Sequence, residues 1–375
     1  MMLGLLLFVG VSYALLILSL NYGFTKLPIQ KKQVTETKTV FSVIIPFRNE
    51  AQKLPKLLQS IKELHYPKDK VSFWLVNDES EDDSVKIIEK FCRENPTWKL
   101  QILQNKRVSH SPKKDAISTA ISKIKSDWIV TTDADCMLPT FWLAAFHQKI
   151  AAENPKMIAA PVTYTTTISF FSYFQLLDFL SLQGTTIGSF GAGFPFMCNG
   201  ANLAYQKAAF LEVQGFSGND NIASGDDVFL LEKFIQKWPK KVVYLKSKNA
   251  IVNTFPVASW KAFVSQRVRW ASKSANYNLR TGKFVGIIVL LMNLLCCLLP
   301  FLVFTAISWR FLFAVFMFKI VLDSVFLLQT LQFTQQKIKP VYMLMSACIY
   351  PYMTIFIFCK SLFSTYTWKN RTFKK

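Results

Sequence analysis

Four long stretches of the chain carry almost no charge, and they limit the folds it can adopt more than any other feature. Each has about the 20 residues that a helix needs to cross a bilayer. Buried helices of a large soluble core usually show a polar face, and these stretches show none. They therefore predict membrane helices, at Leu3–Leu20, Phe284–Ser308, Phe311–Phe333 and about Val341–Phe363.

This pattern divides the chain into an N-terminal transmembrane anchor at 1–24, a soluble-looking domain at 25–283, and a membrane region at 284–375 with about three apolar segments and a basic tail. Lys319 and Asp323 lie one helical turn apart, which predicts a mutual, structural pair facing other helices. Four spans would put the tail and the soluble domain on opposite sides, unless one C-terminal segment is re-entrant or interfacial. The tail is basic through Lys369, Arg371, Lys374 and Lys375.

The net charge of the chain is +21, with 44 Lys and Arg against 23 Asp and Glu. Basic and apolar character together indicate an anionic membrane surface, and no nucleic-acid recognition signature accompanies the charge. The positive-inside tendency places the soluble domain in the cytoplasm, at the inner or plasma membrane if the source is bacterial. The basic residues behind this prediction are Lys26, Lys31, Lys32 and Lys38.

The cysteines and histidines of this chain argue against a cysteine metal site and against histidine-based catalysis. The seven cysteines form no paired metal-ligand spacing, and their odd number fits a reducing compartment. The three histidines, His65, His110 and His147, are isolated in the sequence, so histidine-based catalysis is not expected.

The first half of the soluble region alternates short apolar runs with helical patterns. Strands are expected at 41–47, 71–77, 100–104 and 128–132, and helices at 54–63 and 83–92. The predicted fold class is α/β, a Rossmann-like parallel sheet with helices on both faces.

Carboxylates gather where these strands end, and ligands of open α/β sheets bind at that edge. Asp133 and Asp135 follow the fourth strand, and oxygen ligands in this pattern can hold Mg²⁺ or Mn²⁺ against a diphosphate. No Gly-rich dinucleotide turn and no GxxxxGK[ST] loop is present, which argues against NAD dehydrogenases and P-loop ATPases.

Over Phe41–Trp270 the sequence resembles the family 2 glycosyltransferases, whose catalytic domain has the nucleotide-diphospho-sugar transferase (GT-A) fold. Val43-Ile44-Ile45-Pro46-Phe47-Arg48-Asn49-Glu50 resembles the opening strand and donor-site turn, and Asn77-Asp78-Glu79-Ser80-Glu81-Asp82 resembles the second turn. The resemblance implies donor binding by Pro46, Asn49, Glu50, Asp78, Lys113 and Asp133, with Asp78 on the nucleobase. This chain has Asn77 and Glu79 where the family usually has Asp and Gly, and Pro112 replaces the glycine that usually precedes Lys113.

The same resemblance assigns the remaining site residues. Asp135 and Asp133 match the metal motif, and Asn202 lies in the segment that lines the sugar and acceptor site. Asp227, next to Asp226, matches the base that deprotonates the acceptor hydroxyl. Gln266, Arg269 and Trp270 match the Gln-x-x-Arg-Trp motif of acceptor and diphosphate, on an expected interfacial helix at 259–274.

The resemblance implies an inverting transferase that uses a nucleotide-sugar donor, UDP-linked by expectation, and Mn²⁺ or Mg²⁺. One anchor before the domain and few segments after it are similar to ceramide glucosyltransferase-like enzymes, so a membrane lipid is the expected acceptor. The alternative is a processive polysaccharide synthase, which would need enough helices for a channel. A transporter or an inactive membrane scaffold would not need the ordered carboxylates.

Overall fold

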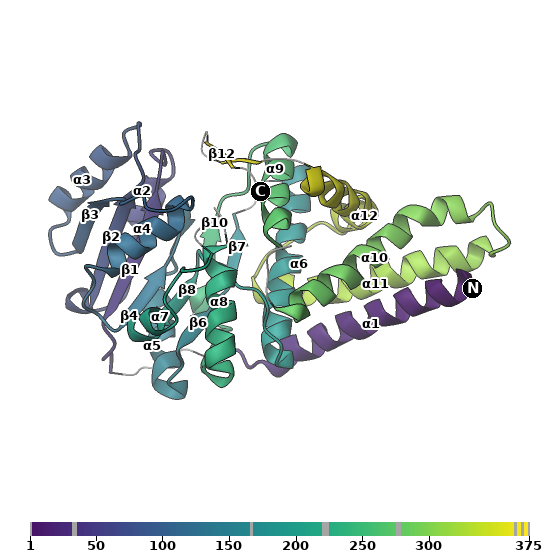
Figure 1. Ribbon diagram of the computed structural model, residues 1–375, viewed down its shortest axis with the longest axis horizontal. Helices are drawn as coiled ribbons and strands as arrows, with labels where there is room; N and C mark the ends of the chain where they lie inside the picture. Colours follow the sequence, from purple (N-terminus) through teal and green to yellow (C-terminus); the bar gives the residue numbers. More distant parts are fainter. Residues whose placement is uncertain are drawn as a thin grey trace.

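The computed structural model describes residues 2–31, 36–165, 168–219, 225–274, 279–363, 366–368 and 371–373. Four of the basic residues used above to predict topology, Lys32, Lys369, Lys374 and Lys375, lie outside these ranges. The described chain forms a sheet domain and a bundle of long helices that projects from it (Figure 1).

The main sheet has seven strands in the order β3-β2-β1-β4-β8-β6-β9. Its first four, β1 (Phe41–Phe47), β2 (Val71–Asn77), β3 (Lys99–Gln104) and β4 (Trp128–Thr131), are parallel, as predicted. The predicted bounds of β1 and β2 are confirmed to the residue, because each is an apolar run that ends in polar residues. β8 (Leu203–Gln206) pairs antiparallel with β4 and with β6 (Met157–Ala159), and β9 (Val242–Tyr244) continues parallel to β6.

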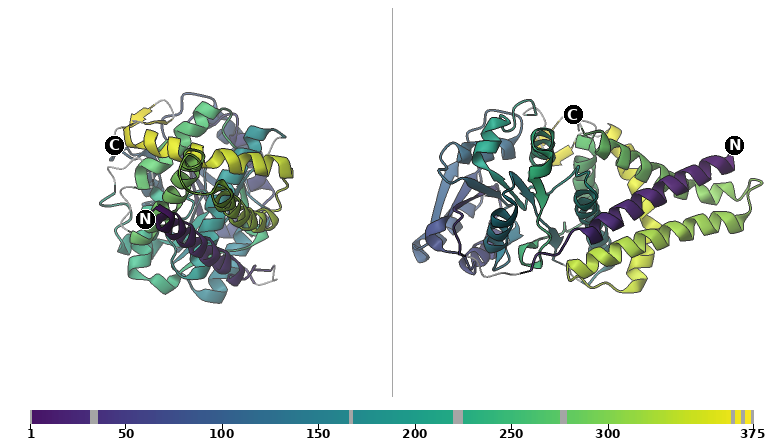
Figure 2. Two further views of the ribbon diagram at one scale, coloured as in Figure 1. Left: turned by 90° about the vertical axis from the view of Figure 1, so that its right-hand side faces the viewer. Right: turned by 90° about the horizontal axis from the view of Figure 1, so that it is seen from below.

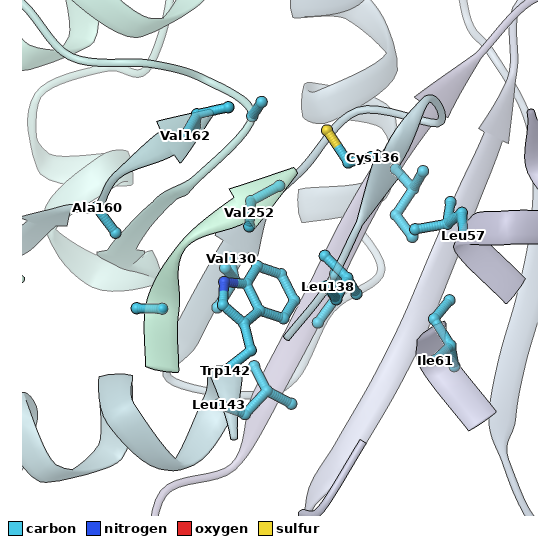
Figure 3. Close-up of a cluster of buried hydrophobic side chains, with 14 of the residues drawn as sticks. Leu57, Ile61, Val130, Cys136, Leu138, Trp142, Leu143, Ala160, Val162 and Val252 are labelled. Atoms are coloured by element: carbon cyan, nitrogen blue, oxygen red, sulfur yellow. The ribbon is translucent and has the colours of Figure 1, made fainter. Parts of the chain in front are cut away.

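Helices cover both faces of this sheet, and a smaller sheet extends it toward the bundle (Figure 1). The smaller sheet joins β5 (Cys136–Met137), β10 (Val252–Thr254) and β7 (Val162–Tyr164). In the core, Leu57 and Ile61 pack near Leu138 and Trp142 (Figure 3). The covering helices are α2 (Leu54–Lys62), α3 (Ser84–Glu94), α4 (Pro112–Ile121), α5 (Trp142–Glu153), α7 (Lys207–Glu212) and α8 (Asp226–Lys237).

The four predicted apolar helices are present, and each is long and apolar enough to cross a membrane. They are α1 (Met2–Lys26), α10 (Arg280–Leu302), α11 (Trp309–Phe333) and α12 (Pro340–Phe363). α1 continues two residues beyond the expected anchor, and α10 begins four residues before the expected membrane region. A hairpin of β11 (Tyr366–Trp368) and β12 (Arg371–Phe373) follows α12.

The long helices do not all run the same way. α1, α10 and α11 project side by side from the sheet domain, whereas α12 lies across them close to that domain (Figures 1 and 2). α12 packs against α10, α6 and α9 (Trp260–Ser274), the helix expected at the interface.

The prediction missed α6 (Phe170–Ala192), which stands between the sheet and the projecting helices (Figure 1). α6 crosses α1 at glycines, because a Cβ on Gly191 would lie 1.8 Å from the Gly23 carbonyl oxygen and one on Gly188 would lie 2.4 Å from that of Leu20. Small residues allow such close helix approaches. α6 therefore belongs to both parts of the molecule.

The predicted pairing of Lys319 and Asp323 is confirmed. Lys319 Nζ lies 2.5 Å from Asp323 Oδ2, and Tyr13 of α1 donates its hydroxyl to Asp323 Oδ1 at 2.5 Å. Lys319 is almost fully buried and faces other helices, as expected. This cluster connects the first and third long apolar helices of the chain.

Candidate active site

The turns that follow β1 and β2 are tied to each other at the carboxyl edge of the sheet. Asn49 has a left-handed backbone with φ of 51°. Its side-chain oxygen accepts from the Glu81 N–H at 2.8 Å, and its own N–H donates to Ser80 Oγ at 3.1 Å. Asn49, predicted to bind the donor, thus holds the two turns together and does not line the cavity beside them.

Asp78, by contrast, lies on the cavity wall together with Pro46 and Glu50. Its carboxylate accepts from Asn105 Nδ2 at 2.7 Å and lies 3.6 Å from Arg107, and its carbonyl accepts from Arg48 at 2.7 Å. Because Asp78 is 4% exposed, these contacts fix its orientation. The turn could therefore present a defined polar edge to a planar ligand.

Lys113 connects Asp133, which follows β4, to Asp226 at the start of α8. It lies in the first turn of α4, where Pro112 suits the helix start. Lys113 Nζ is 2.7 Å from Asp133 and 3.2 Å from Asp226. Burial opposes its positive charge, but the two carboxylates outweigh burial and raise the pKa of Lys113. Lys113 is therefore charged at neutral pH.

The neighbouring Lys114 points away from the cavity. Lys114 is buried, donates to the Asn219 carbonyl at 2.5 Å and lies over the Phe229 ring. Of the two adjacent lysines, only Lys113 lines the cavity.

The Asp133 and Asp135 pair suits a divalent cation that also binds its substrate. Asp135 lies 3.3 Å from Lys53, and both aspartates line the cavity. Among the described residues, no group of three His, Cys, Asp or Glu side chains could hold a metal alone. Mg²⁺ and Mn²⁺ often bind through one or two carboxylates plus phosphate oxygens and water, and a pair of aspartates fits that donor set.

Asp227 lies in the first turn of α8 and lines the same cavity as the metal motif. Its two oxygens accept from the Gly200 and Val228 N–H groups at 3.2 and 2.8 Å. A carboxylate that lines the cavity can act as a base toward a hydroxyl bound there. Gly200 allows the close approach, since a Cβ there would lie 2.8 Å from Asp226 Oδ2.

α9 supplies the wall nearest the bundle. Gln266, Arg269 and Trp270 are half-buried and line the cavity. The prediction passed over Arg267, which is buried, lies 2.5 Å from Asp178 of α6 and sits 4.2 Å from the Trp270 ring centroid. Arg267 thus fixes α9 to α6. The position of Arg267 inside the motif Gln-x-x-Arg-Trp was the sequence signal that could have identified it.

Asn202 does not occupy the predicted position on the acceptor wall. Its side chain is fully buried, accepts from Trp142 Nε1 at 2.9 Å, and donates to the Pro161 and Ala250 carbonyls at 2.7 Å. These contacts satisfy its side-chain amide within the protein core, and the side chain does not line the cavity. Asn199, Gly200 and Ala201 of the same segment line the cavity instead.

One cavity of about 1250 Å³ joins these residues to the bundle. Its wall continues from Asp78 and Asp133 past Asp178 to Tyr13, Asp323 and Tyr350. The sequence did not predict this continuity, because it depends on how α1, α6, α10, α11 and α12 cross.

Comparison with known proteins agrees with this architecture. A family model described as "Glycosyl transferase family 21" matches residues 3–375. The chain is 23% identical over 241 residues to the probable glycosyltransferase YdaM of Bacillus subtilis, covering 61% of this chain and 54% of that protein. It is 21% identical over 274 residues to a beta-monoglucosyldiacylglycerol synthase of Nostoc, covering 72% and 56% respectively. The chain thus spans about half the length of these curated relatives.

Among solved structures, the mannosyltransferase PcManGT from Pyrobaculum calidifontis, in complex with GDP-mannose and Mn²⁺, superposes with a TM-score of 0.56. The match covers 96% of this chain and 98% of that one at 14% identity. At this identity the likeness shows the fold, and the predicted GT-A architecture is confirmed. The model that matches is family 21, whereas the sequence motifs resembled family 2.

Proposed function

The chain belongs to glycosyl transferase family 21, and we propose that it transfers a sugar from a nucleotide-diphosphate sugar, UDP-linked by preference, to a membrane lipid with inversion at the anomeric carbon. Sugar transfer itself follows from the family and from the glycosyltransferase relatives. The identity of the donor, the identity of the acceptor and the inversion at the anomeric carbon are what we propose.

The observation that carries this proposal is the continuity of the cavity. Its polar end lies at the carboxyl edge of the sheet, where α/β folds bind nucleotides. Its other end lies among Ile17, Leu177, Val289 and other apolar side chains of the bundle. A molecule with a hydroxyl headgroup and hydrocarbon chains would fill both ends. The relative from Nostoc is named for synthesis of a glucosylated diacylglycerol, which also favours a lipid.

The chemistry is assigned to residues at the polar end. Asp227 accepts the proton of the acceptor hydroxyl while that oxygen forms a bond to the anomeric carbon. The bond from this carbon to the phosphate oxygen breaks, and the nucleoside diphosphate leaves with the electron pair. Lys113 offsets diphosphate charge, and Asp226, paired with Lys113, holds that lysine in place.

A divalent cation, Mn²⁺ or Mg²⁺, fits Asp133 and Asp135. When bound, it would neutralise charge on the leaving diphosphate. The two lysines now paired with these aspartates, Lys113 and Lys53, can also contact phosphate oxygens. Gln266, Arg269 and Trp270 are assigned to the diphosphate and acceptor side.

We also propose that the catalytic domain faces the cytoplasm. Lys26 ends α1 on the side of the sheet domain, Lys31 and Lys38 follow it, and basic flanks favour the cytoplasmic side. The bundle end of the cavity argues against a polymer channel, because a polysaccharide needs a continuous polar path and the lining there is mainly apolar.

The test incubates purified protein and Mn²⁺ with several radiolabelled nucleotide sugars and a membrane lipid extract. The expected product is an extractable lipid that carries one or a few labelled sugars, with Asp227→Asn as the inactive control. Recovery of a long, detergent-insoluble or secreted glycan would overturn the lipid assignment and favour the synthase.

A further inference from the structure

The fourth apolar helix has the length of a membrane span but lies differently from the others. We propose that α12 does not cross the bilayer but lies in the leaflet next to the catalytic domain, where its outer face contacts lipid chains and its inner face closes the cavity. This inference is independent of the donor and the reaction.

Both ends of α12 contact the catalytic side of the molecule. Before its start, Gln336 donates to Thr163 and to the Tyr164 carbonyl of β7, at 3.3 and 3.1 Å. After its end, the backbone of β11 lies beside α9. A helix of 24 residues is about 36 Å long, and a bilayer crossing would place its ends on opposite sides. α10 and α11, in contrast, meet at the end of the bundle far from the sheet (Figure 1).

The two faces of α12 differ in chemistry. Ser346, Tyr350 and Thr354 recur at intervals of four residues and line the cavity. The Ser346 hydroxyl is buried and has no hydrogen-bond partner within the described part of the chain, which leaves it available to a polar group in the cavity. The opposite face is apolar and exposed, with Leu344 and Phe356 more than half exposed. α12 therefore presents hydroxyl side chains to the cavity and apolar side chains away from it.

Basic residues flank α12 at both ends. Lys337 and Lys339 precede it and Lys360 lies in its last turn, and all three are exposed. Lysines at both ends match a single anionic headgroup layer. In a spanning helix, one group would face the non-cytoplasmic side, against the positive-inside tendency.

The inner face of α12 also meets the buried charge cluster. Lys319 Nζ lies 5.7 Å from the Tyr350 ring centroid and 5.8 Å from that of Tyr13. Between α11 and the sheet domain, α12 therefore closes one side of the cavity.

Two native cysteines allow a direct depth measurement. Cys348 and Cys359 are exposed on the outer face, 11 residues apart. Each is spin-labelled singly after the other cysteines are replaced by alanine, in nanodiscs of phosphatidylcholine and phosphatidylglycerol. Collision rates with oxygen and with a water-soluble nickel chelate then give their depths. Phe313→Cys and Val325→Cys, exposed on α11, form the matched control pair.

The control pair should differ in depth by about 18 Å, as 12 residues of a spanning helix do, whereas the labels at Cys348 and Cys359 should lie within a few ångströms of one depth. A difference of about 16 Å between the α12 labels would overturn the proposal. A second measurement avoids the cysteine replacements. Reporters fused at the two ends of the otherwise unaltered chain should lie on opposite sides of the membrane, and finding both on the same side would equally overturn it.

Discussion

The two ends of the cavity use the same residue types in different ways. At the sheet edge, the side chains of Lys113 and Asp133 are 19% and 37% exposed, and those of Lys53 and Asp135 are 41% and 28% exposed. In the bundle, the Lys319 side chain is 2% exposed and that of its partner Asp323 is 21% exposed. Pairs that are partly open to solvent can exchange partners with a metal or a diphosphate, whereas removing the carboxylate from a fully buried lysine is costly. Exposure, more than residue identity, distinguishes the catalytic charges from the structural ones.

The largest expected effect comes from the metal motif. Asp135→Asn should abolish transfer and weaken metal-dependent donor binding, because one of the two carboxylates for the cation is lost. Thermal unfolding should change little, since Asp135 is open to the cavity. Excess EDTA should reproduce the loss in wild-type protein, and full activity in EDTA would remove the metal from the assignment.

Asp227→Asn should lower turnover by about 100- to 10,000-fold while donor affinity stays nearly unchanged, because this carboxylate acts on the acceptor proton. Steady-state rates and equilibrium binding of the nucleotide sugar measure the two quantities. Asp226→Asn is the neighbouring control and should be milder, since Asp226 pairs with Lys113. Equal losses in both variants, or loss of donor affinity in Asp227→Asn alone, would contradict the assignment.

Substitutions in the bundle should change the stability of the protein more than its turnover, the opposite of what is expected at the sheet edge. Asp323→Leu leaves the Lys319 charge buried without its carboxylate and should destabilise the protein by about 3 kcal/mol. Unfolding in detergent measures the loss, and turnover per folded molecule should fall less than tenfold.

The double variant Lys319→Met with Asp323→Leu should recover most of the lost stability, because neither charge remains. If the double variant is as unstable as Asp323→Leu, the Tyr13 hydrogen bond rather than the ion pair holds the helices together.

The smallest effect concerns Lys246, at the junction of the two regions. Its ammonium donates to the Phe24 and Leu27 carbonyls at the end of α1, and burial lowers its pKa to about 8. An unfolded chain, with the usual lysine pKa of about 10.4, binds more protons above pH 8, so the burial cost is present below pH 8 and is relieved as pH rises.

The melting temperature of wild type minus that of Lys246→Met should therefore rise by about 2 °C between pH 8 and 9.5. A difference that falls over this range would mean that the carbonyl contacts favour the charged form more than burial opposes it.

Predictions from the sequence were most accurate for features that depend on residues close together in the chain. Strand ends such as Asp78 and Asp133 could be located, because an apolar run followed by carboxylates fixes both the strand and its edge. The Lys319–Asp323 pair was also predictable from its spacing.

Features that depend on distant segments could not be predicted. α6 was missed because Asp178 and several Gly, Gln and Ser residues interrupt its apolar character, although these residues meet Arg267 and α1 in the fold. The burial of Asn202 could not be predicted, because its motif gives no information on which residues face the core. The cavity arises only when five helices cross.

The hydrogen bond from Tyr13 to Asp323 joins residues 310 positions apart, which has a consequence for synthesis. At about 5–20 residues per second, the ribosome reaches Asp323 roughly 15–60 s after Tyr13 has been made. During that interval the first helix can wait in the bilayer with its tyrosine hydroxyl lacking this acceptor. Its lasting place among the other helices is decided only near the end of translation, so the earliest segment made is among the last to settle.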